Sequence, residues 1–172
     1  MARLKYILEL LAAAATTLAL PFGVYQLWQT NRTLALERAN QAVSHFLGSD
    51  EMLELAKRIR SKTNGGTQYT ADIMKDSELR GDVNNYLNNL EQIAYFTNKK
   101  LYDLELIQGQ LANIIYKQAN VHLLCNDGSL PGGEPWKTYS ECSFRNANQF
   151  PELRKVYSAW FPHGKFVDYS DR

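Results

Sequence analysis

The stretch from Leu10 to Trp28 carries no charged side chain, and this 19-residue run limits the possible folds more than any other feature of the chain. A helix over this run is roughly 28 Å long, close to the hydrocarbon thickness of a bilayer of about 30 Å. The sequence therefore predicts a membrane-spanning helix within residues 1–30. Two alternatives stay open, a secretory signal peptide and a buried core helix of a soluble domain.

Small residues recur at every fourth position of this run, at Ala15, Ala19 and Gly23. Such a row lets helix backbones approach closely in lipid, so these three residues are candidates for association between membrane helices and for a homo-oligomer. The alternative is that an alanine-rich run simply forms a good helix. Pro21 lacks a backbone donor and crowds the preceding turn, which predicts a kink.

The charges around the run decide the membrane topology only weakly. Arg3 and Lys5 precede the apolar residues, and Arg32 and Arg38 follow them. Because positive residues concentrate on the cytoplasmic side, and further cations lie beyond Arg38, the count favours a cytoplasmic C-terminal part. We therefore expect a single-pass membrane protein.

The remainder of the chain has the composition of one soluble domain. After the first 30 residues there are 17 basic and 17 acidic side chains, so no overall field draws this part to duplex nucleic acid. We expect three regions: a transmembrane segment over residues 1–30, a juxtamembrane helix over 31–48 and a soluble helical domain over 49–172.

Apolar residues at three- and four-residue spacing predict an all-α fold, in which the N-terminal transmembrane helix is followed by a small helical bundle with one long loop excursion. Ser49 and Asp103 are expected helix caps, and Pro151 suits a first helical turn. Cys125 and Cys142 lie in the excursion over residues 125–148, either as a disulfide or as free thiols. The expected helices cover residues 28–47, 50–60, 77–98, 104–124 and 151–160.

No catalytic signature occurs in the sequence. It holds no phosphate-binding glycine loop, dinucleotide fingerprint, nucleophile elbow or paired-histidine zinc motif. His45, His122 and His163 lack ligand spacing with one another and with the cysteines. We therefore expect no enzyme activity, no catalytic residue, no metal site and no cofactor.

A cluster of cations, Lys57, Arg58, Arg60 and Lys62, precedes a Gly-Gly pair at residues 65–66. Cations beside free backbone N–H groups can hold phosphate, so this cluster is a candidate ligand site. The alternative is that the cations stabilise the C-terminus of a helix and that the loop is merely solvated.

Four asparagines, Asn84, Asn85, Asn88 and Asn89, fall within six positions of one expected helix. Asparagine is a weak helix former, so the quartet suggests another demand, such as binding adenine edges or forming hydrogen bonds between subunits. A plain polar face is the alternative.

Several segments carry a resemblance to a known family: residues 25–28 (YQLW), 86–96 (YLNNLEQIAYF) and 101–103 (LYD), and then Phe150, Leu153 and Trp160. Together they resemble an uncharacterised bacterial family of short proteins that pair an N-terminal membrane helix with a small helical domain. The resemblance implies that fold and a place in the bacterial inner membrane, and it transfers no catalytic residue. In architecture alone, the chain is also similar to the membrane effectors of type III CRISPR systems that cyclic oligoadenylates gate.

These observations lead to three hypotheses of function. The first is a membrane-anchored, non-enzymatic, oligomeric effector of antiphage defence, in which the cation cluster and the asparagines bind a cyclic oligonucleotide and the span perturbs the bilayer. The second is a structural anchor or accessory subunit of a membrane protein complex. The third, a membrane-tethered enzyme, requires a site that only the fold would assemble.

Overall fold

The computed structural model describes residues 2–62, 76–123, 144 and 148–162, and along the first helix it describes side chains from Thr17 onward except that of residue 18. This part of the chain is all-α, as predicted. Its elements are α1 (Ala2–Gly48), α2 (Asp50–Lys62), α4 (Ser77–Asn98), α5 (Leu104–Gln118), the π-helix η1 (Ala119–Leu123) and α6 (Pro151–Trp160).

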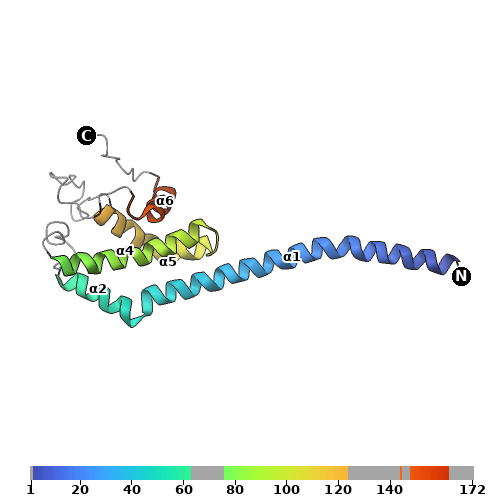
Figure 1. The fold of residues 1–172 in the computed structure, drawn as a ribbon, viewed down its shortest axis with the longest axis horizontal. Coiled ribbons are helices and arrows are strands. Elements are labelled where there is room, and N and C mark those ends of the chain that lie inside the picture. Colours follow the sequence, from blue (N-terminus) through green and yellow to red (C-terminus); the bar gives the residue numbers. More distant parts are fainter. Residues whose placement is uncertain (1, 63–75, 124–143, 145–147, 163–172) are drawn as a thin grey trace.

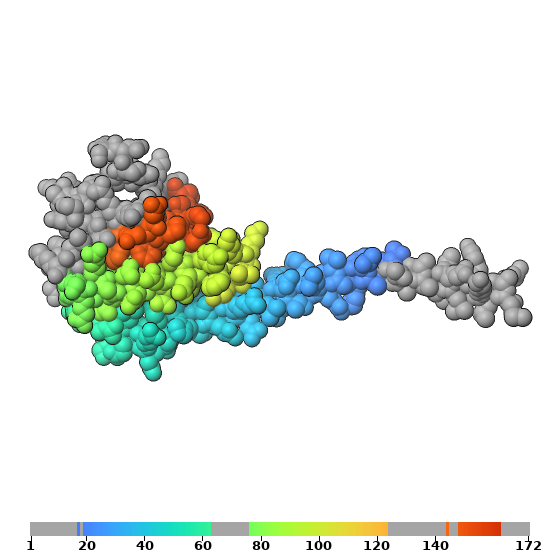
Figure 2. Space-filling model, in the orientation of Figure 1, coloured from blue at the N-terminus to red at the C-terminus, as the bar shows by residue number. Residues whose placement is uncertain are grey.

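A long rod and a helical head make up the molecule. The N-terminal part of α1 projects away from the other helices, while its C-terminal part lies along them (Figure 1). The space-filling view shows the same projection (Figure 2). Because α1 runs unbroken from Ala2 to Gly48, the predicted boundary at residues 30/31 falls inside one continuous helix, which also passes through Pro21.

The predicted membrane span is not confirmed by the fold. A search of the described residues for a helix that is both long and apolar enough to cross a bilayer finds none. The span over Leu10–Trp28 therefore stays a prediction.

Helix α4 lies at the centre of the head and packs against α2, α5 and α6. The spacing of apolar residues predicts its buried face, and the structure confirms that face, since every member except the partly buried Tyr86 is buried. The buried members are Leu79, Val83, Leu87, Leu90, Ile93 and Ala94.

The C-terminal part of α1 belongs to the head. Ala39, Val43 and Phe46 recur along one face of the helix and are buried in the core. The backbone N–H of Asp103 also donates to the carbonyl of Ala35 at 3.2 Å, which ties α1 to the turn between α4 and α5. The rod is therefore fixed to the head by both packing and a backbone hydrogen bond.

Local capping explains where the helices begin. The backbone N–H of Met52 donates to the hydroxyl oxygen of Ser49 at 3.3 Å, and that of Leu106 donates to the carboxylate of Asp103 at 2.9 Å. Both predicted caps are therefore confirmed. The predicted bounds of α4 and the start of α6 at Pro151 are confirmed as well.

Helix α4 ends in a Schellman motif. The N–H of Leu101 donates to the carbonyl of Phe96, and the N–H of Lys100 donates to that of Thr97. Lys100 occupies the left-handed position of the motif, with φ of 58°. Glycine is the usual residue there, because a side chain makes this backbone conformation unfavourable.

Helix α6 takes its N-terminal cap from another helix. Phe150, the residue before it, makes no capping hydrogen bond from its side chain. Instead, the carboxylate of Glu91 on α4 accepts from the backbone N–H groups of Glu152 and Leu153 at 2.9 and 2.7 Å. A carboxylate at this end also suits the positive pole of the helix dipole.

Two features of the C-terminal half differ from the prediction. Leu104, expected on the apolar face of α5, is 50% exposed, whereas Ile107 in the same turn is fully buried. The α-helix expected to reach residue 124 ends at Gln118 and continues as the π-helix η1. The excursion over residues 125–148, with Cys125 and Cys142, lies almost entirely outside the described residues, apart from the buried Phe144.

Replacing Lys100 by glycine should stabilise the fold. The Lys100→Gly variant relieves the left-handed strain at the end of α4, and we expect a gain of about 0.5–1 kcal/mol in the free energy of unfolding. Urea unfolding followed by circular dichroism measures this gain. The same change at Lys99, whose φ is −81°, serves as the control and should not stabilise. An unchanged or lower stability of Lys100→Gly would contradict the assigned backbone conformation.

Acidification should destabilise the head through His122. Burial lowers the pKa of His122 to about 4, against 6.5 for a free imidazole. Between pH 6.5 and about 4, the His122 side chain is therefore protonated in the unfolded chain and neutral in the folded one. The free energy of unfolding falls over this range as the pH drops, by up to roughly 3 kcal/mol. His122→Leu should flatten this slope in pH-dependent unfolding. His45→Leu, at an exposed site, should leave it in place; equal slopes in wild type and His122→Leu would refute the assignment.

Candidate functional site

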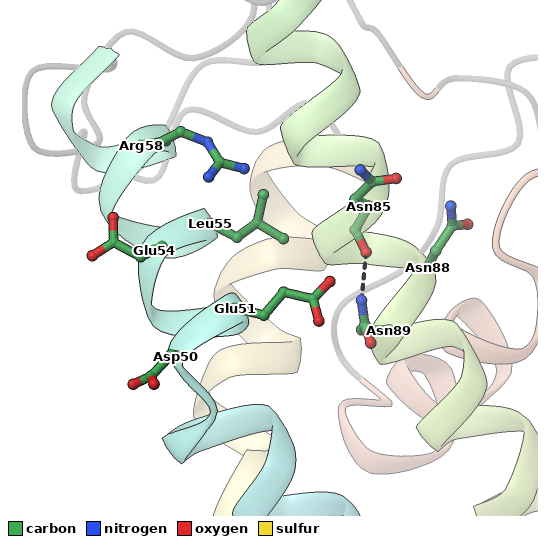
Figure 3. A pocket seen from close by; sticks show the side chains of 8 residues that line it. All are labelled: Asp50, Glu51, Glu54, Leu55, Arg58, Asn85, Asn88 and Asn89. Atoms are coloured by element: carbon green, nitrogen blue, oxygen red, sulfur yellow. Dashed lines mark hydrogen bonds between the residues drawn. The ribbon is translucent and has the colours of Figure 1, made fainter.

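A cavity of about 540 Å³ lies between α2 and α4. Helix α2 contributes its first turns and α4 its middle, where three of the four asparagines lie (Figure 3). The lining residues are Asp50, Glu51, Glu54, Leu55, Arg58, Asn85, Asn88 and Asn89.

The polar side chains of this cavity point in different directions. Figure 3 shows Glu51 extending toward α4, whereas Asp50 and Glu54 point away from it. The amide nitrogen of Asn89 donates to the backbone carbonyl of Asn85 at 3.0 Å. One asparagine side chain is thus engaged within its own helix.

Arg58 is paired within the protein. Its guanidinium donates to both carboxylate oxygens of Asp82 on α4, from Nε at 3.0 Å and from Nη2 at 2.9 Å. This hydrogen-bonded carboxylate raises the pKa of Arg58 above its ordinary value. Asp82 is buried while Arg58 stays half exposed, so the pair joins α2 to α4 at the rim of the cavity.

Lys62 pairs with α4 in a similar way. Its Nζ lies 2.7 Å from a carboxylate oxygen of Glu78 and 3.3 Å from one of Asp76, and the hydrogen bond to Glu78 is the main reason that the pKa of Lys62 is raised. The pKa of Asp76 is lowered, first by the hydrogen bond that it accepts from the N–H of Leu79 and then by Lys62. The positive charge of Lys62 is thus compensated by the carboxylates of Glu78 and Asp76.

The predicted cation cluster is therefore not gathered at one open surface. Of its four members only Arg58 lines the cavity, and Lys57 pairs with Glu54 on its own helix at 3.4 Å. Arg60 also has an interaction partner. The Gly-Gly pair at residues 65–66, the other half of the predicted phosphate site, lies outside the described residues.

The structure brings together part of the predicted asparagine site. Asn85, Asn88 and Asn89 line the cavity, and Asn84 does not. The prediction assigned these amides and the cation cluster to one ligand, but the acids Asp50, Glu51 and Glu54 also line the cavity. Their position at the start of α2 is itself explained by the positive end of the helix dipole.

The cavity is electronegative as a result. The carboxylate of Glu51 extends into it, whereas those of Asp50 and Glu54 lie at its border and point away from α4. Asp82 compensates the charge of Arg58, and Lys57 pairs with Glu54. A polyanion brought into it would be repelled by like charges at short range, whereas a cation or a donor of hydrogen bonds would not. The chemistry of this lining therefore differs from that of a phosphate site.

A second cavity, of about 280 Å³, lies where the end of α4 meets α1. It is mostly apolar, with Arg38 and Gln41 as its polar members. Its other lining residues are Ala42, Phe96, Leu101 and Tyr102.

The remaining candidate residues are dispersed. Ala19 and Gly23 lie exposed on the projecting part of α1, and the side chain of Ala15 is outside the description. A methyl group added at Gly23 would meet nothing within 4 Å. His122 is buried edge-on against Phe144, and among the described residues no group of three potential ligands could hold a metal ion.

Two carboxylates of α4, Asp82 and Glu91, each accept two hydrogen bonds from another helix. Neither was predicted from the sequence as a functional residue. Both lie beside the apolar stripe of α4, three or four positions from buried members of it. A charged residue within such a stripe is a signal of a buried ion pair or cap, because it would otherwise face the core without compensation. That signal is present in the sequence, although the partners are not identifiable from it.

Comparison with known proteins finds one family. Residues 11–120, more than half of the chain, match the family described as Domain of unknown function (DUF4760). No curated protein and no solved structure matches the chain. The matched region runs from α1 to the second residue of η1, so it includes both cavities and the turn between α4 and α5. The chain therefore belongs to the DUF4760 family.

Proposed function

We propose that this chain is a single-span, non-enzymatic anchor of the bacterial inner membrane that holds a helical head at the bilayer surface for a partner complex. The observation that carries the proposal is the exposure of the projecting part of α1. From residue 19 to residue 34 every side chain is exposed, although the first ten of these positions include six large apolar residues. The six are Leu20, Phe22, Val24, Tyr25, Leu27 and Trp28.

The distribution of these residues around the helix favours lipid over a single protein partner. At about 100° per residue, the six side chains spread over more than half of the circumference, wider than the stripe that one packing partner usually covers. The residues of the Leu10–Trp28 run that precede this exposed part also carry no charge. A hydrocarbon environment would cover all sides of such a helix at once.

The end of the run has the side chains of a membrane interface. The rings of Tyr25 and Trp28 lie 6.3 Å apart, and the guanidinium of Arg32 lies 5.7 Å from the centre of the Trp28 ring. Aromatic rings followed by a cation are typical of the headgroup level. Arg32 and Arg38 just beyond it support a cytoplasmic head by the positive-inside rule.

One narrow face of α1 carries none of the six bulky side chains, and this face supports a homo-oligomer. Ala19 and Gly23 lie on it, together with Gln26 and Thr30, whose hydroxyl donates to the carbonyl of Gln26 at 2.9 Å. A small-residue face opposite bulky lipid-facing side chains suits close packing of one span on another.

The anchor is better supported than the ligand-gated effector. The candidate cations are paired with carboxylates, and the cavity that gathers the asparagines is electronegative. A cyclic oligonucleotide bound there would have to displace these pairs and approach the carboxylate of Glu51, with Asp50 at the border of the cavity, which makes it a poor ligand for this surface.

The anchor predicts that two charges on the exposed apolar part of α1 release the protein from membranes. In the full-length chain, Leu20→Asp with Val24→Asp adds about 2.5–3.5 kcal/mol for each charge placed near the bilayer centre. Wild type should stay in the pellet after alkaline carbonate extraction of bacterial membranes, and the variant should move to the supernatant.

The matched control is Leu47→Asp with Leu53→Asp. These leucines are also exposed, at 40% and 51%, but lie at the far end of α1 and on α2. The control should stay membrane-bound like wild type. Extraction of wild type, or equal behaviour of the two double variants, would overturn the anchor.

The choice between anchor and effector has its own test. Calorimetric titration of cyclic oligoadenylates into the detergent-solubilised full chain should give no binding at micromolar concentration. Affinity purification from native membranes should instead recover a second protein in fixed proportion. Micromolar binding of the oligonucleotide would replace the anchor by the effector, and a homo-oligomer without another protein would count against an accessory subunit.

A further inference from the structure

The turn between α4 and α5, residues 99–103, is the end of the head that lies toward the projecting part of α1. Figure 1 shows α4 and α5 meeting at this end, whereas α2 and the start of α4 lie at the other. The hydrogen bond from the Asp103 N–H to the carbonyl of Ala35 fixes the level of the turn along α1.

That level falls close to the expected membrane surface. Seven residues separate Trp28 from Ala35, which corresponds to about 10 Å along the helix. The polar layer of each leaflet is about 5–8 Å thick, so the turn lies just outside it and a lysine side chain spans the remaining distance.

The turn is both cationic and apolar at its tip. Lys99 and Lys100 are exposed, and Leu101 and Leu104 beside them are 42% and 50% exposed. Exposed leucines next to lysines are the combination with which peripheral segments enter the headgroup region of anionic membranes.

The surrounding charges leave this region positive. Arg38 of α1 borders the same cavity as Leu101 of the turn, and Arg32 lies six residues nearer to Trp28 on the same helix. The acids nearby are Glu37, Glu105, Asp103 and Glu152. Asp103 is engaged as the cap of α5, and Glu152, which Lys99 also attracts, pairs with Lys155 at 2.6 Å. Lys99 lies over the ring of Tyr95, with 5.6 Å between Nζ and the ring centre, which is compatible with an exposed ammonium group.

Lys100 supplies a second, independent argument. It holds the left-handed position of the Schellman motif, where glycine would serve the fold better. Phe150 keeps the same conformation within the core, whereas Lys100 is exposed, so packing within the described head does not account for the lysine. A negatively charged surface that the turn faces accounts for a cation at the outermost position of the turn.

We propose that the turn formed by Lys99, Lys100 and Leu101, with Leu104 beside it, docks on the headgroups of anionic lipids. The inference rests on the anchor proposed above and adds a second point of attachment. With α1 in the bilayer and the turn on its surface, the head has one fixed orientation, and the cavity between α2 and α4 is turned away from the membrane.

Depth-sensitive fluorescence tests the docking in the full-length chain. Both native cysteines are replaced (Cys125→Ser, Cys142→Ser), and one new cysteine is placed at the turn by Leu101→Cys or on α2 by Leu53→Cys. Each is labelled with a nitrobenzoxadiazole dye and reconstituted into phosphatidylcholine vesicles with or without phosphatidylserine. The dye at position 101 should shift to the blue and be quenched by brominated acyl chains, more strongly with phosphatidylserine. The dye at position 53 should keep the emission of a dye in water with both kinds of vesicle.

Charge reversal distinguishes an effect of the two lysines of the turn from an effect of the net charge of the protein. Lys99→Glu with Lys100→Glu, in the Leu101→Cys protein, should abolish the effect of phosphatidylserine, because each lysine near an anionic surface contributes about fivefold to docking. The control, Lys57→Glu with Lys117→Glu, changes the net charge equally at exposed sites away from the turn and should keep the effect. Lys100→Gly should weaken the response to phosphatidylserine while the protein remains folded.

The outcomes distinguish the two proposals. Flotation in a density gradient shows whether the chain is bound to the vesicles. If the chain floats with neither kind of vesicle, the anchor is overturned and the docking with it. If it floats but the dye at position 101 behaves like that at position 53, only the docking is overturned. An equal response in the two charge-reversal variants would also overturn it.

Discussion

Burial of one face of α4 is the interaction on which the rest of the head depends. The face begins with Leu79 and Val83 and continues to Ala94, so three helices can pack around it at once. Helix α5 then carries the packing on to α1. Loss of apolar area from α4 would therefore weaken contacts to α2, α5 and α6 together.

Two carboxylates at the edges of that face give the packing its direction. Asp82 holds the guanidinium of Arg58, and Glu91 holds the first N–H groups of α6. Apolar contacts alone are not directional, so helices on an apolar face can slide or rotate with little loss of free energy. Charged hydrogen bonds to one guanidinium and to one helix end remove that freedom.

The sequence was sufficient for those parts of the fold that depend on neighbouring residues. The bounds of α4 follow from apolar spacing, and the starts of α2 and α5 follow from Ser49 and Asp103, which act within three residues. The contacts that failed to appear in the sequence join residues far apart in the chain. Arg58 and Asp82 are 24 positions apart, and Glu91 and Glu152 are 61 apart. For this reason the sequence of the cation cluster predicts a phosphate site, although acids of α4 pair with Arg58 and Lys62. The asparagines of the cavity lie on one helix, so their spacing in the sequence already places them together.

The unbroken course of α1 makes the rod a rigid shaft rather than a tether. Between Trp28 and Ala35 the helix has no loop that could absorb a twist, and its C-terminal part is clamped by Ala39, Val43 and Phe46. Inserting one residue in this stretch would swing the head by about 100° around the shaft and lift it by about 1.5 Å, and seven inserted residues would nearly restore the original azimuth at a greater height. A rotation or an axial displacement of α1 at Trp28 would therefore turn or shift the helices of the head with it.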